Sequence, residues 1–323
     1  MTAMPEITTT RANPLIDPAL HIWHAEIPLY LFLGGLVAGL MVITGYWLLR
    51  RPSAPPSRAL ALLPWMAPIL LSVGMLFLWL DLENRLNASR FYFAFRPASP
   101  MSWGSWILVA VYPVSIGLAW HLTPADLRAA VHRGLRGPVW LGRLETWLAA
   151  RERGLGLASV LLGAALGVYT GVLLGALAAR PLWNSAILGP LFLVSGVSTG
   201  AAFMLLHRLA PGERRMLARA DLWLIGVELF LIGLWLAGLM SGGAASRAAA
   251  GSLLGGPYTA AFWTLVVAVG LVTPMAAEWI ESRRGEMPGR FAAGLVLVGG
   301  LALRWIVVFA GQHAGWPANL AGF

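Results

Sequence analysis

The stretch RPASPMSWGSW, residues 96–106, decides how the rest of this chain is interpreted. Pro97 and Pro100 each fix φ and bias the preceding residue away from the α conformation, which excludes a helix across them. Ser102 then occupies the position of a helix N-cap, and an apolar run covers residues 103–120. Arg96, Trp103 and Trp106 therefore lie at the start of a predicted membrane helix. This arrangement fits an aromatic belt at a bilayer surface, and it also fits the rim of a ligand site.

The composition indicates a protein that lies in the lipid bilayer. The 323 residues are 58% hydrophobic and 11% charged, whereas ordinary soluble domains carry about 25% charged residues. The formal net charge is +9, and every basic residue is an arginine in or near a short segment between apolar runs, apart from one inside a run. This pattern is typical of membrane topology rather than of nucleic-acid binding. The absence of cysteine excludes disulfides and cysteine-bound iron–sulfur clusters within this protein.

Eight apolar runs are long enough to cross the hydrocarbon core, which requires about 20 helical residues. The predicted spans are 25–49, 61–80, 103–120, 155–178, 186–207, 222–240, 257–278 and 291–311. The connection 122–154 is predicted to carry one amphipathic interfacial helix around 138–152. The sequence thus predicts an all-α integral membrane protein of eight transmembrane helices. Residues 1–24 form an outer N-terminal segment in this prediction, and residues 25–323 form the membrane domain.

The arginines are divided unevenly between the two sides of the membrane. The loops after the first, third, fifth and seventh spans hold 16 arginines, and the N-terminal segment with the remaining loops holds 6. Arginine-rich loops stay in the cytoplasm, so both termini are predicted to be periplasmic in a bacterial inner membrane. The 96–106 stretch then lies on the outer side.

Among the ionisable residues within the apolar runs or at their ends, four are singled out. They are Asp81, Glu228, Glu278 and Arg304. A charge at membrane depth costs at least about 2.5 kcal/mol, so each must pair, become neutral or contact water. Glu278 is interpreted as a solvated helix end because further charged residues follow it, and Asp81 lies near the outer interface. Glu228 and Arg304 form either a structural ion pair or part of a proton path.

Two other classes of membrane protein compete with this interpretation. His24 and His313 fall near the outer face, and His121 and His207 fall near the inner face, as two bis-histidine haem sites would require. Each histidine lies at a helix end, however, where an axial ligand would leave the macrocycle among the headgroups. A diheme cytochrome b anchor is therefore an alternative. A secondary transporter, with helices broken at mid-membrane, is a weaker one.

Six motifs follow one another along these spans. They are HIWHAEIPLYLFLGGLVAGL (21–40), WLDLENR (79–85), RPASPMSWGSW (96–106), YTGVLLGALAARPLWN (169–184), LFLVSGVSTGAA (191–202) and LRWIVVFAGQ (303–312). In this order and frame the sequence resembles the NrfD/PsrC family, the integral membrane subunits of polysulfide-reductase-type respiratory complexes. The resemblance covers nearly the whole length, and it implies two four-helix bundles.

The resemblance also implies a function. The family's membrane subunit exchanges electrons and protons between a quinone and a peripheral ferredoxin-like iron–sulfur subunit on the outer face. The quinone is menaquinone or ubiquinone. That peripheral subunit connects to a molybdopterin-type catalytic subunit. The family's membrane subunit holds no redox cofactor, so neither haem nor an iron–sulfur cluster is expected here. No metal site is expected either.

The positions that match the family's quinone site are His21, His24 and Tyr169. His21 stands where polysulfide reductase has an asparagine. Reduction of a quinone needs a donor at each carbonyl and a route for two protons. Trp103 and Trp106 are expected to close this site toward the docked subunit. Two further sets of residues complete the prediction: a proton path of Asp81, Glu228 and Arg304, and a partner rim of Arg96 and Arg180.

Overall fold

The computed structural model describes residues 23–50, 55–82, 85, 96, 99–177, 180–284 and 289–314, which form helices without strands. Eight spans among them are long and apolar enough to cross a membrane, which confirms the predicted number. Five are the single helices α1 (Glu26–Arg50), α5 (Pro100–Leu122), α8 (Glu152–Gly175), α9 (Leu188–Leu205) and α14 (Arg290–His313). The long helix α10 (Pro211–Ser241) is a sixth.

The two remaining spans are composite. One joins α2 (Arg58–Leu62), the 3₁₀ turn η2 (Leu63–Trp65) and α3 (Met66–Asp81). The other passes from α12 (Thr259–Ala261) through the π-helix η4 (Phe262–Val272) into α13 (Thr273–Arg284). Neither the 3₁₀ turn nor the π-helix is predicted by hydropathy, because both leave the apolar run uninterrupted.

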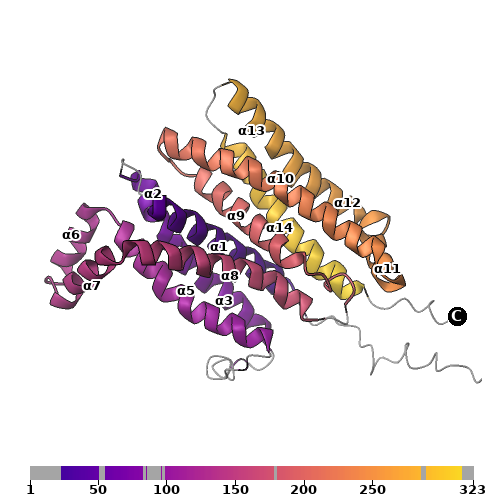
Figure 1. The fold of residues 1–323 in the computed structure, drawn as a ribbon, viewed down its shortest axis with the longest axis horizontal. Coiled ribbons are helices and arrows are strands. Elements are labelled where there is room, and N and C mark those ends of the chain that lie inside the picture. Colours follow the sequence, from indigo (N-terminus) through magenta and orange to yellow (C-terminus); the bar gives the residue numbers. More distant parts are fainter. Residues whose placement is uncertain are drawn as a thin grey trace, which may run out of the picture.

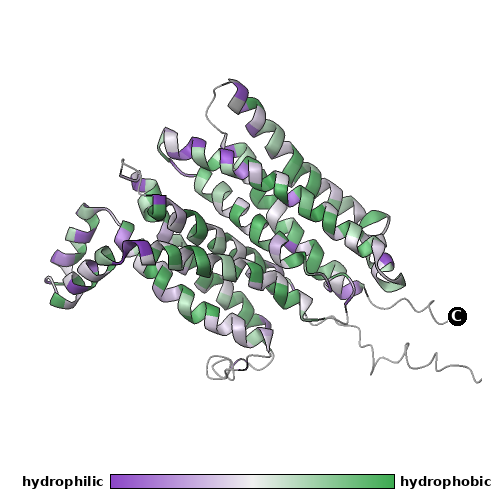
Figure 2. Cartoon of the chain, viewed as in Figure 1, coloured by the Kyte–Doolittle hydropathy of each residue, from purple (hydrophilic) through white to green (hydrophobic). Residues whose placement is uncertain are grey.

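The long helices lie side by side, inclined alike (Figure 1). Hydrophobic residues cover their lengths, and hydrophilic residues gather at α6 and at neighbouring helix ends (Figure 2). Helices α1, α3, α5 and α8 form one contacting set, and α9, α10, η4 and α14 form another. Helix α1 also packs on α9, so one hydrophobic core runs through both sets. The division into two four-helix bundles stays a prediction.

Helices α1 and α9 approach closely because glycines face one another where they meet. A Cβ added at Gly196 would lie 2.7 Å from the carbonyl oxygen of Gly35. One added at Gly200 would lie 2.7 Å from the carbonyl carbon of Gly39. Small residues of this kind allow membrane helices to pack backbone against backbone. This contact joins the two sets of helices.

The start of α5 differs from the prediction. The helix begins at Pro100 with Ser99 as its N-cap residue, so Ser102 is not the cap. Proline is favoured at the first helical position, where its fixed φ fits and its missing N–H costs nothing. The Ser102 hydroxyl instead accepts a hydrogen bond from the backbone N–H of Arg96 at 3.0 Å. Ser102 thereby fastens the segment that precedes the helix.

The connection between α5 and α8 holds two helices where one was predicted. They are α6 (Ala125–Gly134) and α7 (Val139–Ala150). The backbone reverses between them at Arg136 and Gly137, which both have a φ of 60°. Glycine adopts this left-handed conformation readily, and Pro138 then precedes the new helix.

Helix α10 begins well before its predicted start at residue 222. The Glu213 carboxylate accepts hydrogen bonds from the backbone N–H groups of Ala210, at 3.0 Å, and Ser57, at 2.7 Å. This capping extends the helix through a charged stretch that hydropathy leaves out. The short helix α11 (Ala244–Leu254) was not predicted either.

Candidate functional site

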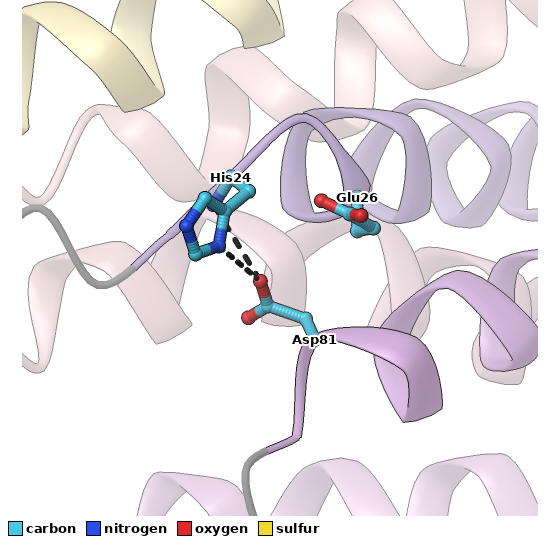
Figure 3. A group of neighbouring side chains, drawn as sticks. All are labelled: His24, Glu26 and Asp81. Carbon is cyan, nitrogen blue, oxygen red and sulfur yellow. Dashed lines mark hydrogen bonds and ion pairs between the residues drawn. The ribbon is translucent and has the colours of Figure 1, made fainter.

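The first polar cluster lies where the start of α1 meets the end of α3. The Nδ1 atom of His24 is 3.4 Å from Oδ1 of Asp81, and the backbone N–H of His24 donates to the same oxygen at 3.5 Å (Figure 3). The His24 side chain is 74% exposed, whereas that of Asp81 is 8% exposed. A buried carboxylate therefore orients an exposed imidazole, whose other ring nitrogen is left to face a ligand.

Glu26 completes this cluster. His24, Glu26 and Asp81 each offer one atom of metal-ligand type, and these atoms lie within 4.8 Å of one another. Among the described residues, the Glu26 Oε2 atom has no hydrogen-bond partner although it is buried. An imidazole and two carboxylates at this spacing can hold and pass protons. They are also groups that bind divalent cations, and the expectation of no metal stays a prediction.

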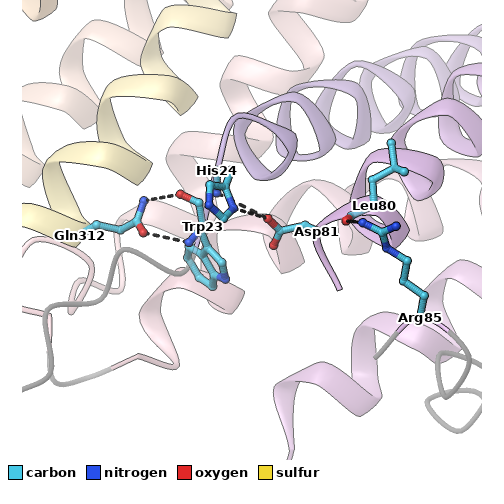
Figure 4. A network of polar contacts seen from close by, with 6 residues as sticks. All are labelled: Trp23, His24, Leu80, Asp81, Arg85 and Gln312. Atoms are coloured by element: carbon cyan, nitrogen blue, oxygen red, sulfur yellow. Dashed lines mark hydrogen bonds and ion pairs between the residues drawn. The ribbon is translucent and has the colours of Figure 1, made fainter. Parts of the chain in front are cut away.

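The segment that carries His24 is fixed to α14. Gln312 accepts from the backbone N–H of Trp23 at 3.1 Å and donates to its carbonyl at 3.0 Å (Figure 4). The Trp23 indole stacks on that of Trp183, with ring centroids 5.1 Å apart. On the other side of the cluster, Arg85 donates to the carbonyl of Leu80 at 2.8 Å and so caps the end of α3. Both backbone segments that form the His24–Asp81 pair are held in place.

Tyr169 of α8 is buried against the first turns of α5. Its ring and hydroxyl lie over Gly104, where an added Cβ would collide with both. Ser102 and Ser105 occupy the buried face of α5, while Trp103 and Trp106 stand on its exposed face. The structure thus brings Tyr169 to the 96–106 stretch. The two indoles point away from the buried face that receives the tyrosine.

Two other predicted site residues, Arg180 and Arg96, have different surroundings. Arg180 is only 4% exposed, and it donates to the carbonyl of Gln312 at 3.2 Å. Its guanidinium therefore holds the end of α14, and the side chain is not presented on an outer rim as predicted. Arg96 is tied through its backbone N–H to Ser102. His21 lies outside the described residues.

The second polar cluster is buried between α9, α10 and α14. The Arg304 Nη1 atom donates to the Ser195 hydroxyl at 3.0 Å and to the Gly300 carbonyl at 2.8 Å. Glu228 is buried close to the same serine and to Arg304. Arg304 also faces the Phe192 ring, with 5.3 Å between its Cζ and the ring centroid. Glu228 and Arg304 therefore lie in one buried cluster with Ser195, and their role as a structural pair or as part of a proton path stays a prediction.

Two more acids extend this cluster along α10 and α13. The Ser198 hydroxyl donates to Oδ1 of Asp221 at 2.5 Å. Asp221 precedes Glu228 by about two helical turns, or roughly 10 Å, on the same face. Glu278 is buried too, so its interpretation as a solvated end is wrong. Asp221 Oδ2 and Glu278 Oε2 are both buried without a hydrogen-bond partner among the described residues.

Sequence reasoning missed several of these residues. Asp221 falls one residue before the predicted sixth span, so its burial was not expected. The Thr199 hydroxyl donates to the carbonyl of Gly196 within its own helix, whereas the Ser198 hydroxyl donates across to Asp221 of α10. Gln312 is the last residue of the motif at 303–312. The motif marks the position of Gln312 but does not predict its contact with Trp23. Each omission concerns a contact between helices distant in sequence.

Eight spanning helices with buried charges between them define a multi-pass membrane protein. The sequence matches the family described as "Polysulphide reductase, NrfD" over residues 14–314. It is 33% identical over 306 residues to Protein NrfD of Escherichia coli (strain K12), covering 90% of this protein and 95% of that one. It is 30% identical over 304 residues to the C chain of polysulfide reductase from Wolinella succinogenes, covering 90% and 94%.

The protein therefore belongs to the polysulphide reductase, NrfD family. This membership confirms the predicted family. It also supports the coarser part of the predicted function, a membrane subunit of an oxidoreductase.

Proposed function

We propose that this protein is the quinone-reacting membrane subunit of a multi-subunit respiratory oxidoreductase. Its substrate is menaquinone or ubiquinone, which takes up two electrons and two protons on reduction and releases them on oxidation. The observation that carries the proposal is the pairing of exposed His24 with buried Asp81. An imidazole held in this way can hydrogen-bond a carbonyl oxygen and exchange a proton with it, while the carboxylate stabilises the imidazolium.

Tyr169 supplies the second donor in this proposal. Its hydroxyl lies at Gly104 of α5, within the same set of helices that carries the His24–Asp81 pair. The apolar walls of these helices suit a lipophilic ring with a few polar groups at its ends. Trp103 and Trp106, on the exposed face of α5, are assigned to close the site toward the docked iron–sulfur subunit. His21 is a further donor by its motif position.

The electrons are exchanged with a separate subunit. Because this protein has no cysteine, an iron–sulfur cluster held by cysteines must belong to a partner. We assign that role to a ferredoxin-like subunit on the outer face, connected to a molybdopterin-type catalytic subunit. The relative from Wolinella succinogenes is named as one chain of a reductase, which fits such an assembly. Arg96 is a candidate contact of this partner, whereas Arg180 acts by fixing the α14 end beside the site.

The buried cluster provides an inward proton path in this proposal. Glu278, Asp221, Glu228 and Arg304 run from the arginine-rich helix ends toward the middle of the α9–α10–α14 packing. Hydroxyl groups of Ser195 and Ser198 stand between them and can relay protons. Carboxyls that exchange protons in the dry interior must change charge there, which is why such residues mark proton relays.

The orientation of the protein places the His24 cluster on the periplasmic side of a bacterial inner membrane. Sixteen arginines against six support this orientation. Alkaline phosphatase fused after Phe323 is expected to be active, and a fluorescent protein that matures only in the cytoplasm is expected to stay dark. The opposite pattern would place the cluster on the cytoplasmic side.

A diheme anchor is the competing class. It would require the outer histidines to share a macrocycle, yet His24 lies beside Asp81, and His313 Nδ1 lies 2.7 Å from the Tyr258 hydroxyl. A reduced-minus-oxidised absorption spectrum of the purified protein distinguishes the two classes.

The site itself is tested by removing one donor at a time. Tyr169→Phe and His24→Ala are each expected to weaken quinone binding by about 1–3 kcal/mol, because a carbonyl oxygen loses its partner in a desolvated site. Quinone-linked turnover is measured at saturating and at limiting quinone in the assembled complex. The control is Tyr258→Phe, which removes a hydroxyl of the same end that contacts His313. Unchanged kinetics in both donor variants at both concentrations would refute the site.

A further inference from the structure

An apolar cavity of about 570 Å³ lies between α5 and the helix pair α6–α7. This pair stands at one end of the molecule, beyond the end of α5 (Figure 1). The cavity walls include Trp120 of α5, Leu144, Trp147 and Leu148 of α7, and Leu155 of α8. A volume in this range suffices for a small ligand or part of a larger one.

The polar groups beside the cavity are engaged with one another. Glu145 accepts a hydrogen bond from the Trp120 indole at 3.2 Å, and its carboxylate lies 3.2 Å from Nε2 of His132. The indole of Trp65, also in the wall, donates to the Thr123 hydroxyl at 2.9 Å. The two bonds of Glu145 hold α6 and α7 against the end of α5. The wall that a ligand would contact is therefore hydrocarbon, which disfavours a quinone ring with its two carbonyl oxygens.

The connection that carries α6 and α7 beside the cavity, here called the rim, is strongly basic. The connection 122–154 holds six arginines against three acidic residues. Glu145 is bonded to Trp120, and Asp126 pairs with Arg58 at 3.1 Å. Arg133, Arg136 and Arg143 are exposed on α6, on α7 and in the turn between them. The Arg151 guanidinium lies over the Trp147 ring at 4.8 Å, which places a cation at the cavity wall.

We propose that this cavity holds an acyl chain of an anionic phospholipid whose headgroup lies against the arginines of α6 and α7. Hydrocarbon walls select the acyl group, and the unbalanced positive charge selects the headgroup. Basic pockets beside membrane helices on the cytoplasmic side bind anionic lipids in this way. The pair α6–α7 has the exposed apolar residues and arginines of an interfacial element. The proposal concerns the arginine-rich end and does not depend on the quinone site.

The test uses the full-length protein in detergent, titrated with phosphatidylglycerol or with phosphatidylcholine, with bound lipid counted by native mass spectrometry. We expect the wild type to retain phosphatidylglycerol at least tenfold more tightly than phosphatidylcholine. The rim variant Arg133→Gln/Arg136→Gln/Arg143→Gln should lose most of that preference. All three positions are exposed, so the variant should fold.

A matched control separates this site from general attraction to a basic surface. Arg208→Gln/Arg215→Gln/Arg219→Gln removes three exposed arginines at the same arginine-rich side but away from the cavity, and it should keep the preference. Equal loss in both triple variants, or equal binding of the two lipids by the wild type, would overturn the proposal.

A cavity-filling variant tests the acyl group. Leu144→Trp adds volume at a wall residue that is partly exposed, and it should reduce phosphatidylglycerol retention several-fold while the arginines remain. Retention equal to that of the wild type would mean that the headgroup binds without its acyl group entering the cavity, which contradicts the proposal. Retention of quinone in place of phospholipid would also overturn the assignment.

Discussion

The two polar clusters contain similar groups in opposite surroundings. In the first, here called the outer cluster after its proposed orientation, His24 meets Asp81 with the imidazole 74% exposed. Between α9, α10 and α14, Arg304 donates to Ser195 and lies near Glu228, and all three residues are buried. Water screens the outer pair and can replace either partner. Arg304 is surrounded by protein groups, so only these can compensate a lost charge. Removal of one charge therefore has a different free-energy cost in the two clusters.

This difference indicates a division of roles. The outer cluster has an unpartnered Glu26 oxygen and an exposed ring nitrogen, so it can accept a ligand or a proton without disturbing the helices. The buried cluster is built into the packing, since the Arg304 guanidinium fills the space beside Gly35 and Gly300. A proton that moves through it must change the charge of groups that also hold α9, α10 and α14 together. Function and stability are therefore separable at the outer cluster and linked at the buried one.

The largest effect is expected from breaking the buried pair. Glu228→Gln leaves the Arg304 charge without its counter-charge, which costs about 3–5 kcal/mol when a buried pair loses one partner. We expect less folded protein in membranes and a lower melting temperature in detergent. Glu228→Gln/Arg304→Met removes both charges and should recover much of the stability, because neither group is then stranded.

The recovered double variant also separates structure from proton transfer. If the pair belongs to the proton path, quinone-linked turnover per folded complex stays low although stability returns. Normal turnover per complex would show that the pair serves packing alone. If Glu228→Gln were as stable as the wild type, the Arg304 charge would not depend on Glu228 for its stability, which would contradict this prediction.

The contrast between the clusters also explains how far the sequence could predict them. The eight spans follow from runs of apolar residues, and the arginine count follows from composition, so neither depends on tertiary structure. His24 and Tyr169 were predicted because they stand in motifs, and their role stays a proposal. Asp221 and Glu278 were missed or misjudged because their burial depends on α10 starting at Pro211 and on the packing around α13. The contacts of Glu26 and Gln312 likewise exist only once distant helix ends meet.

A smaller effect is expected from displacing Tyr169 without altering it. Gly104→Ala places a methyl group where the tyrosine ring and hydroxyl lie, so the ring must move. Overpacking of this kind costs about 1–3 kcal/mol. Apparent quinone affinity should fall roughly tenfold, as about 1.4 kcal/mol of lost binding would give.

The control for this substitution is Gly233→Ala in α10. A Cβ at Gly233 would meet nothing within 4 Å, so the same methyl group enters open space. It should leave stability equal or raise it by up to about 1 kcal/mol, because alanine favours helix. Quinone kinetics in Gly104→Ala that match those of Gly233→Ala would show that the Tyr169 position does not matter to the site.

The smallest effect on stability is expected at the outer cluster, from Asp81→Asn. The amide oxygen can still accept a hydrogen bond from His24, and a pair with one exposed partner contributes only about 0–1 kcal/mol. The melting temperature should therefore change little, in contrast to Glu228→Gln.

The amide cannot act as a base, however, and it no longer stabilises a protonated imidazole, so turnover at saturating quinone should fall more than apparent affinity. Asp126→Asn provides the control, because it changes a carboxylate that pairs with Arg58 at 3.1 Å where both side chains are exposed, and it should leave turnover unchanged. A large loss of stability in Asp81→Asn, or full turnover in it, would remove the distinction between the two clusters.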